Sequence, residues 1–215
     1  VAGGTGFYLR ALLEGLAPGP ERDAGLRARL AGREQRRTGF LHRLLRRLDP
    51  VTALRIHPND INKLTRALEI SIAAGQPASL VFSTGRRGLE GYKTLKLVLD
   101  PPRDALHEAI HVRTLGMWER GLDREVRRLL DDGLAPSAKP FESLGYKEAL
   151  AYIQGRLSRE DAIEQTTIGT RQYAKRQLTW FRRELEATWL AGFGNQPEVE
   201  NQAIEQVRAF LSEFT

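Results

Sequence analysis

Hydrophobic positions in the first third of the chain recur mostly at helical spacing. Between residues 18 and 75, leucines and isoleucines stand three or four positions apart, which predicts three or four short helices. Breaks are expected at Gly32, at Asp49-Pro50 and at residues 57–60. At the last two, proline excludes continuation of a helix. Asp60 is then placed to cap the next helix.

Later segments mix one strand with further helices. Residues 94–100 alternate and then run apolar before Pro101-Pro102, which predicts one complete strand. Helical patterns follow at about 103–132, 147–154 and 158–186, then a loop around 192–194 and a last helix at about 198–214. The glycine-rich opening at residues 1–6 predicts the last step of a strand, a turn and a helix start. We interpret it as a βα loop at the edge of a site, and we expect the preceding strand to lie upstream of Val1.

Composition narrows the class of protein. The 215 residues are 41% hydrophobic and contain no cysteine, and no apolar run is long enough to span a bilayer. We therefore expect a globular protein of the cytoplasm with no membrane partner. The net charge of +6 suits a polyanionic partner, although an arginine-rich solvated surface is an alternative. Arginine is most concentrated between residues 22 and 47.

Residues 166–183 predict a helix that is rich in cationic and amide side chains. These fall on two adjoining faces: Arg171, Lys175 and Arg182 on one, and Gln172, Arg176, Thr179 and Arg183 on the other. Guanidinium and ammonium groups attract phosphates, and glutamines can hydrogen-bond to bases or sugars. The helix can therefore line a phosphate-rich channel, or it can be a surface helix with solvated charges.

Five segments, in order along the chain, resemble the tRNA dimethylallyltransferases, also called tRNA isopentenyltransferases. They are residues 3–8 with 12–16, residues 60–69, Arg113 with Met117 and Gly121, residues 144–148, and the helix at 170–182. The resemblance implies a P-loop NTPase-like α/β core, mostly helical here, formed by residues 1–17 and 93–215. It also implies a helical insertion domain at residues 18–92 that binds the anticodon stem of tRNA.

The activity implied by the resemblance is prenyl transfer. Dimethylallyl diphosphate donates its dimethylallyl group to the exocyclic N6 amine of the adenosine on the 3′ side of the anticodon, and the enzyme is expected to be a monomer. In the family, a P-loop with Mg²⁺ holds the diphosphate and an aspartate is the general base. No Gly-x-x-x-x-Gly-Lys-Ser/Thr occurs in this sequence. We therefore expect the Mg²⁺ ligands and the base to lie upstream of Val1, and these 215 residues alone to be inactive or nearly so.

Site residues follow from the same resemblance. Thr5 is expected beside the target base, where its hydroxyl orients the attacking amine; a helix-cap role is the alternative, and both could hold. Arg113 is expected at the prenyl diphosphate, or else on a helix surface. Both are assigned as catalytic. The residues expected to bind tRNA are Thr5, Arg27, Asn62, Lys63, Leu64, Thr65, Arg66, Arg171, Gln172, Lys175, Arg176 and Gln177.

Two other classes of function stay open. His107-Glu108-Ala109-Ile110-His111 satisfies the His-Glu-x-x-His pattern of zinc hydrolases, with both imidazoles on one helical face. A third zinc ligand would have to be a carboxylate such as Glu119 or Glu125. The second alternative is an RNA-binding module without catalysis.

Overall fold

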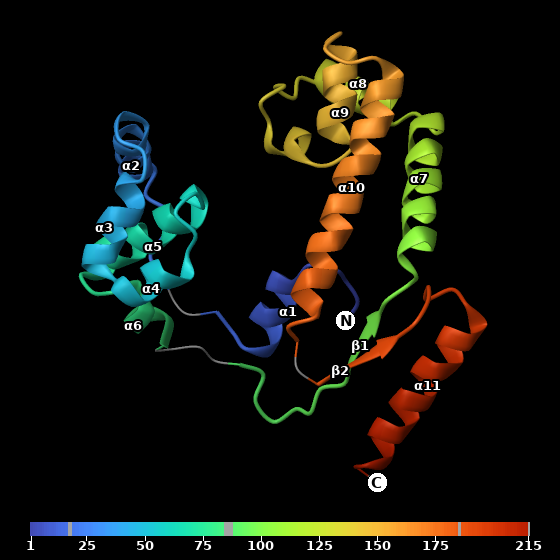
Figure 1. Ribbon diagram of the computed structural model, residues 1–215. Helices are drawn as coiled ribbons and strands as arrows, with labels where there is room; N and C mark the ends of the chain where they lie inside the picture. Colours follow the sequence, from blue (N-terminus) through green and yellow to red (C-terminus); the bar gives the residue numbers. More distant parts are fainter. Residues whose placement is uncertain (17–18, 84–87, 185, 215) are drawn as a thin grey trace. The chain divides into compact units, whose positions relative to one another are not determined.

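The computed structural model describes residues 1–16, 19–83, 88–184 and 186–214, and it separates into two compact units (Figure 1). One unit consists of Val1–Gly6 and Lys93–Thr215, and the other is Phe7–Tyr92. The sequence analysis assigned residues 1–17 to the first part. Whether these compact units are the functional domains stays a prediction.

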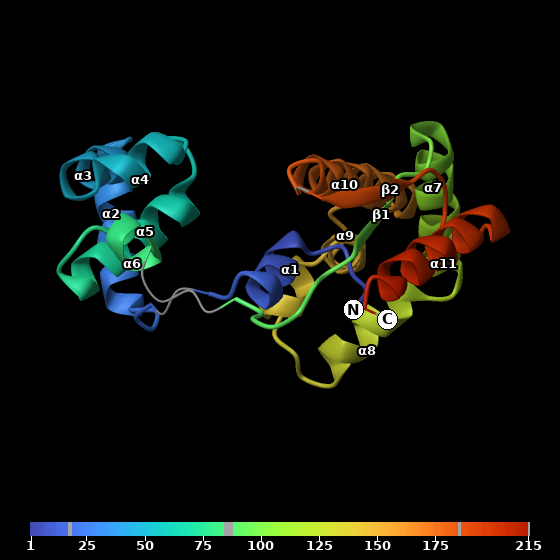
Figure 2. The ribbon, with the colours of Figure 1, turned by 90° about the horizontal axis from the view of Figure 1, so that it is seen from below.

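The Phe7–Tyr92 unit is helical. Its elements are α1 (Gly6–Leu13), α2 (Ala24–Arg36), α3 (Phe40–Leu48), α4 (Pro50–Arg55), α5 (Ile61–Ala74) and α6 (Ala78–Ser83). Helices α2 to α6 gather into one bundle (Figure 2). The core of this bundle is made by the periodic apolar residues, among them Leu30, Leu41, Leu45, Leu64 and Leu68, which are fully or almost fully buried. Apolar residues at helical spacing thus lie on one face of each helix, and this face is buried.

Aspartates set the helix boundaries in this bundle. Asp60 accepts a hydrogen bond from the backbone N–H of Lys63 (3.1 Å) at the start of α5, which confirms the predicted cap. Asp49 ends α3 and caps α4 through the N–H of Thr52 (3.0 Å). Its second oxygen accepts the N–H of Ser79 (2.7 Å), so this buried carboxylate also holds α6.

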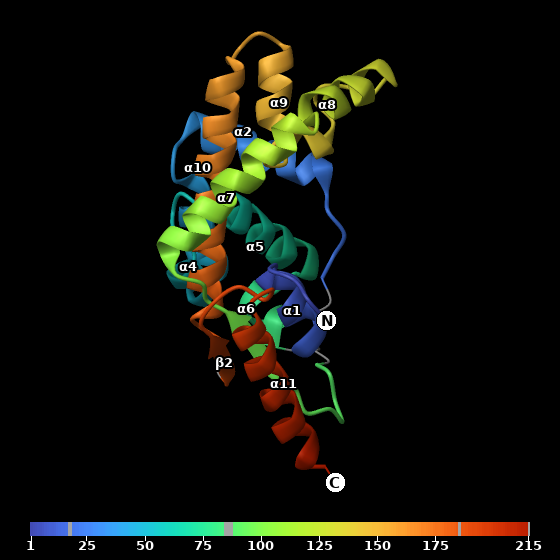
Figure 3. The ribbon, with the colours of Figure 1, turned by 90° about the vertical axis from the view of Figure 1, so that its right-hand side faces the viewer.

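The other unit combines a small sheet with long helices. Its elements are β1 (Lys96–Leu99), α7 (Arg103–Glu119), α8 (Leu122–Asp131), the 3-10 turn Lys139–Glu142, α9 (Tyr146–Ile153), α10 (Arg159–Phe181), β2 (Ala187–Leu190) and α11 (Pro197–Ser212). Helices α7 and α9 both pack against α10, and α8 packs against α9 (Figure 3). Trp118, Leu122, Val126, Phe141 and Leu150 lie in its core.

The sheet corrects the expectation of a single strand. β1 pairs in parallel with β2, with Lys96 opposite Ala187 and Leu99 opposite Leu190. Residues 187–190 were expected to lie between a helix and a loop. A strand of four residues is too short for its alternation to be visible, and its partner is distant in the sequence.

Three smaller expectations also needed correction. The break expected at Gly32 does not occur, because α2 continues through this residue to Arg36. The helical pattern at 103–132 is two helices, because Gly121 has φ 95°, a left-handed conformation that favours glycine and ends the run. Residues 1–3 are not in a strand. No helix in the described ranges has the length and apolar character needed to cross a membrane.

Candidate functional site

The glycine-rich start of the chain lies against the C-terminal half of α10. The side-chain amide of Gln177 donates a hydrogen bond to the carbonyl oxygen of Gly4 (2.7 Å). A Cβ atom on Gly6 would lie 2.1 Å from the ring of Trp180, so only glycine permits this approach. The neighbour that the glycines accommodate is therefore α10.

This packing brings together two residues that the sequence assigned to one site. Thr5 lies between the two glycines that contact α10, and Gln177 is on α10 itself. Thr5 is exposed, and its hydroxyl group makes no hydrogen bond with another described residue. The helix-cap alternative for this hydroxyl finds no support in these contacts, and the group is available to a ligand.

The predicted channel residues of α10 differ in exposure. Gln172, Lys175 and Arg176 are exposed, and the guanidinium of Arg176 lies 5.7 Å from the ring centre of Tyr173. Arg171 is half-buried and reaches the carbonyl oxygen of His107 through Nη2, at a long 3.4 Å. Its Nε is buried without a hydrogen-bond partner among the described residues. A buried donor of this kind is costly unless water or a ligand accepts from it.

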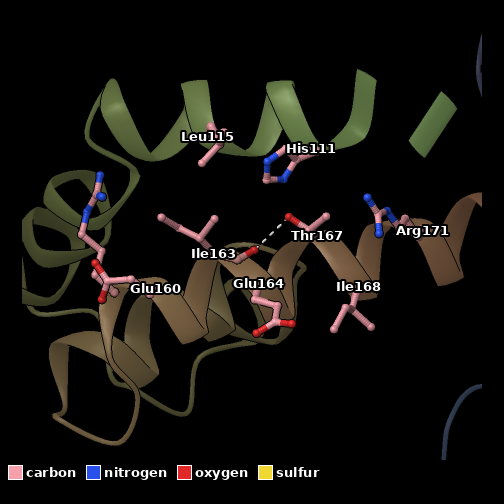
Figure 4. Close-up of a pocket in the computed structure, with 9 residues that line it drawn as sticks. His111, Leu115, Glu160, Ile163, Glu164, Thr167, Ile168 and Arg171 are labelled. Carbon is pink, nitrogen blue, oxygen red and sulfur yellow. Dashed lines mark hydrogen bonds between the residues drawn. The ribbon is translucent and has the colours of Figure 1, made fainter. Parts of the chain in front are cut away.

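A pocket of about 570 Å³ lies between α7 and α10, beside Arg171. His111 and Leu115 extend from α7 toward α10, and Thr167 and Arg171 point back toward α7 (Figure 4). Thr167 is occupied by a hydrogen bond to the carbonyl of Ile163 (2.9 Å). Arg113 is on the exposed surface of α7 and does not line this pocket.

The zinc alternative finds no complete ligand set. His107 and His111 are half-buried on α7, and His111 faces the pocket. Across the residues that the structure describes, no group of three or more His, Cys, Asp or Glu side chains could hold a metal ion. The same observation applies to Mg²⁺, so these residues do not fit a metal centre and we assign no step to one.

A second cluster of predicted residues lies in the Phe7–Tyr92 unit, around Glu69. Arg27 donates from Nε to Oε1 (2.9 Å) and from Nη2 to Oε2 (2.8 Å) of this carboxylate. Arg66 donates from Nη1 to Oε2 (2.5 Å). These hydrogen bonds, with Arg27 the largest cause, lower the pKa of Glu69 from 4.5 to about 2 against the opposing effect of burial.

Sequence reasoning missed Glu69, although it lies within the matched segment 60–69. The available signal was its position next to Leu68 and Ile70, since a carboxylate within a buried stripe requires charged partners. Without the structure, the arginines that fill this role could not be identified among the many in the segment.

The other predicted residues of α5 lie on both sides of that helix. Asn62 and Lys63 are exposed, and Lys63 pairs with Asp60 (2.6 Å). Thr65 is half-buried. Leu64 is fully buried in the core, so only its backbone could meet a ligand.

The comparisons with known proteins agree with one another. The family model described as IPP transferase matches residues 1–184. The tRNA dimethylallyltransferase of Solibacter usitatus is 54% identical over 213 residues, which are 99% of this chain and 69% of that protein. The protein of the same name from Koribacter versatilis is 46% identical over 97% of this chain and 68% of its own length.

Two solved structures extend the likeness to the fold. A eukaryotic dimethylallyltransferase acting on tRNA matches with a TM-score of 0.76 at 26% identity, over 98% of this chain and 56% of the other. The tRNA isopentenylpyrophosphate transferase of Bacillus halodurans matches with a TM-score of 0.58 at 31% identity, over 97% of this chain and 64% of the other.

Proposed function

Because this chain belongs to the IPP transferase family, we propose that it carries the tRNA-recognition part of a tRNA dimethylallyltransferase. In the reaction, the N6 amine of the adenosine on the 3′ side of the anticodon attacks C1 of dimethylallyl diphosphate. The new N–C bond forms as the C–O bond to the diphosphate breaks, pyrophosphate leaves, and the amine loses a proton to a base. The related proteins named tRNA dimethylallyltransferase support this assignment.

The observation that carries the proposal is the contact of the glycine turn with α10. Gln177 binds the carbonyl oxygen of Gly4, the residue before the exposed Thr5, and the same helix presents Lys175 and Arg176 on its exposed side. With the backbone of the turn held in place, the Thr5 hydroxyl can hydrogen-bond to the N6 amine and orient it toward the prenyl carbon. The cations can bind tRNA phosphates or offset the charge of the leaving diphosphate.

Arg113 is proposed to meet the prenyl diphosphate. It is exposed on α7, and an exposed guanidinium can form a bidentate contact with phosphate oxygens. A P-loop NTPase-like core with Mg²⁺ completes the proposed site. The described residues offer no ligand set for that ion, and no step is derived from it.

The basic helices of the other unit are proposed to bind the anticodon stem. Exposed arginines in and beside these helices include Arg22, Arg29, Arg33, Arg36, Arg37, Arg43, Arg46 and Arg47. Phosphate contacts position a nucleic acid without reading its sequence, so these residues would place the stem and leave base selection to the Thr5 region. We further propose that the protein acts as a monomer in the cytoplasm.

The proposal is tested by transfer of a radiolabelled prenyl group to tRNA by the product of the complete gene. Thr5→Ala is expected to lower the rate by about 100-fold, since correct orientation of reacting groups makes contributions of this order. Thr94→Ala, which removes another exposed threonine of the same unit, is the matched control. If the protein binds tRNA normally but never transfers label to it, the protein is an RNA-binding module and the transferase assignment is wrong.

A binding measurement separates the two halves of the proposal. We expect the 215-residue chain alone to bind tRNA but to transfer almost no label, because its sequence has no P-loop motif. Failure of this chain to bind tRNA at low salt would contradict the role given to its basic helices.

A further inference from the structure

Glu69 is a fully buried carboxylate that is shared by three donors. Oε1 accepts the backbone N–H of Asp23 (2.8 Å) and Nε–H of Arg27 (2.9 Å). Oε2 accepts from Arg27 (2.8 Å) and from Arg66 (2.5 Å). The side chain of Glu69 is 1% exposed, so these contacts replace its hydration. Asp23 caps α2, and the carboxylate therefore also fixes the entry into that helix.

The two arginines keep donors for another partner. Their side chains are 32% and 36% exposed. Arg27 uses Nε and Nη2 on Glu69, and its Nη1 makes no hydrogen bond with a described residue. Arg66 also donates from Nη2 to the carbonyl oxygen of Pro20 (3.0 Å). A guanidinium has five N–H groups in a rigid fork, so holding one edge on a carboxylate fixes the direction of the remaining donors.

We propose that Glu69 is a positioning residue for tRNA binding, which holds Arg27 and Arg66 in the orientation in which they meet phosphates of the tRNA backbone. This inference rests on the proposed function. The partner is a polyanion because the cluster carries two guanidinium charges against one carboxylate. Free arginines at a surface lose rotamer entropy when they bind phosphate, whereas arginines already held in place lose less.

Simple electrostatics and positioning predict opposite signs for one substitution. Glu69→Gln removes a negative charge beside the proposed tRNA surface, so charge alone predicts tighter binding. Loss of the fixed geometry predicts weaker binding. The direction of the change in affinity therefore distinguishes the two explanations.

Asp49 supplies a matched control within the same unit. It is 1% exposed, and it accepts hydrogen bonds from the backbone of Thr52 (3.0 Å) and from the backbone and hydroxyl of Ser79 (2.7 and 2.9 Å). Asp49→Asn removes the same charge from a buried, hydrogen-bonded site. No arginine or lysine is held by Asp49 in the described residues, so a loss of affinity caused only by a weakened fold should occur in both variants.

The experiment measures binding of an unmodified tRNA transcript to the 215-residue chain by fluorescence anisotropy over a range of salt concentrations, at a temperature where circular dichroism shows the variants folded. We expect Glu69→Gln to raise the Kd about tenfold and Asp49→Asn to leave it unchanged or slightly lower. In the complete gene product, Glu69→Gln should raise KM for tRNA while kcat and KM for the prenyl diphosphate stay the same.

Glu69→Asp keeps the charge and carries the test if the glutamine variant does not fold. Its shorter side chain cannot span Asp23, Arg27 and Arg66 together, so we expect the Kd to rise about threefold at constant charge. The proposal is overturned if Glu69→Asp binds like the unmodified chain, or if Glu69→Gln and Asp49→Asn change the Kd equally. Absence of binding by the unmodified chain would instead refute the proposed function.

Discussion

Replacing Gly6 by alanine tests whether the glycine turn depends on direct contact with α10. The new methyl group would lie 2.1, 2.3 and 2.3 Å from three atoms of the Trp180 ring, whereas carbon atoms in contact are usually about 3.5 to 4 Å apart. The ring or the turn must therefore move by more than 1 Å, roughly the difference between these distances. Overpacking of this kind costs about 1–3 kcal/mol.

Helix propensity acts in the opposite direction. Gly6 is the first residue of α1 and does not have a positive φ, so alanine is allowed there and favours the helix by up to about 1 kcal/mol. The net expectation is a loss of between about 0 and 3 kcal/mol in the free energy of unfolding, with a central value of about 1–2 kcal/mol. The sign of the change in the free energy of unfolding shows whether the contact with Trp180 outweighs the helix propensity of alanine.

Urea unfolding followed by tryptophan fluorescence measures this effect. All three tryptophans, Trp118, Trp180 and Trp189, belong to the unit that contains Gly6, so the signal reports on that unit. Gly3→Ala is the matched control because a Cβ there has nothing within 4 Å. A Gly6→Ala variant as stable as Gly3→Ala would refute the close packing of the turn on α10.

Three further outcomes are expected. The folded-state pKa of Glu69 is depressed from 4.5 to about 2, so its stabilisation is complete above pH 4.5 and is lost as the pH falls toward 2. Unfolding followed by helicity at a series of pH values should show the free energy of unfolding falling by about 2–3 kcal/mol more in the unmodified chain than in Glu69→Gln over this window. This figure allows for the partial exposure of the arginines. Leu45→Ala, at a fully buried position, should cost about 2–5 kcal/mol in urea unfolding, whereas Leu54→Ala, 90% exposed, should cost less than about 0.5 kcal/mol. Arg113→Ala in the complete gene product should slow prenyl transfer by about 100-fold without changing the Kd for tRNA, and equal effects on both would contradict its role at the diphosphate.

Local features of the fold could be predicted from the sequence. The caps at Asp49 and Asp60 depend on residues a few positions away, and Pro50 and Pro58 mark the helix boundaries beside them. The periodic leucines likewise identify the buried face of each helix. β2 could not be predicted, because its four residues form a strand only through pairing with β1.

In the candidate site too, contacts between residues far apart in the sequence could not be predicted. Resemblance pointed to Thr5 and Gln177 separately, but only the structure shows them joined through Gly4. For Arg27 and Arg66, the sequence indicated positive charge, and the carboxylate that orients both was not identified. A buried ion pair depends on three-dimensional proximity, which the charge pattern along a chain does not contain.

The continuity of the Phe7–Tyr92 unit has a consequence for synthesis on the ribosome. Its core residues, from Leu30 to Val81, all lie in one uninterrupted stretch, so the bundle can close as soon as that stretch leaves the exit tunnel. The other unit cannot close at that stage, because β1 must wait for β2, which is translated after α10. A nascent chain arrested once residue 92 has left the exit tunnel should therefore already carry a protease-resistant basic bundle, before β2 has been translated.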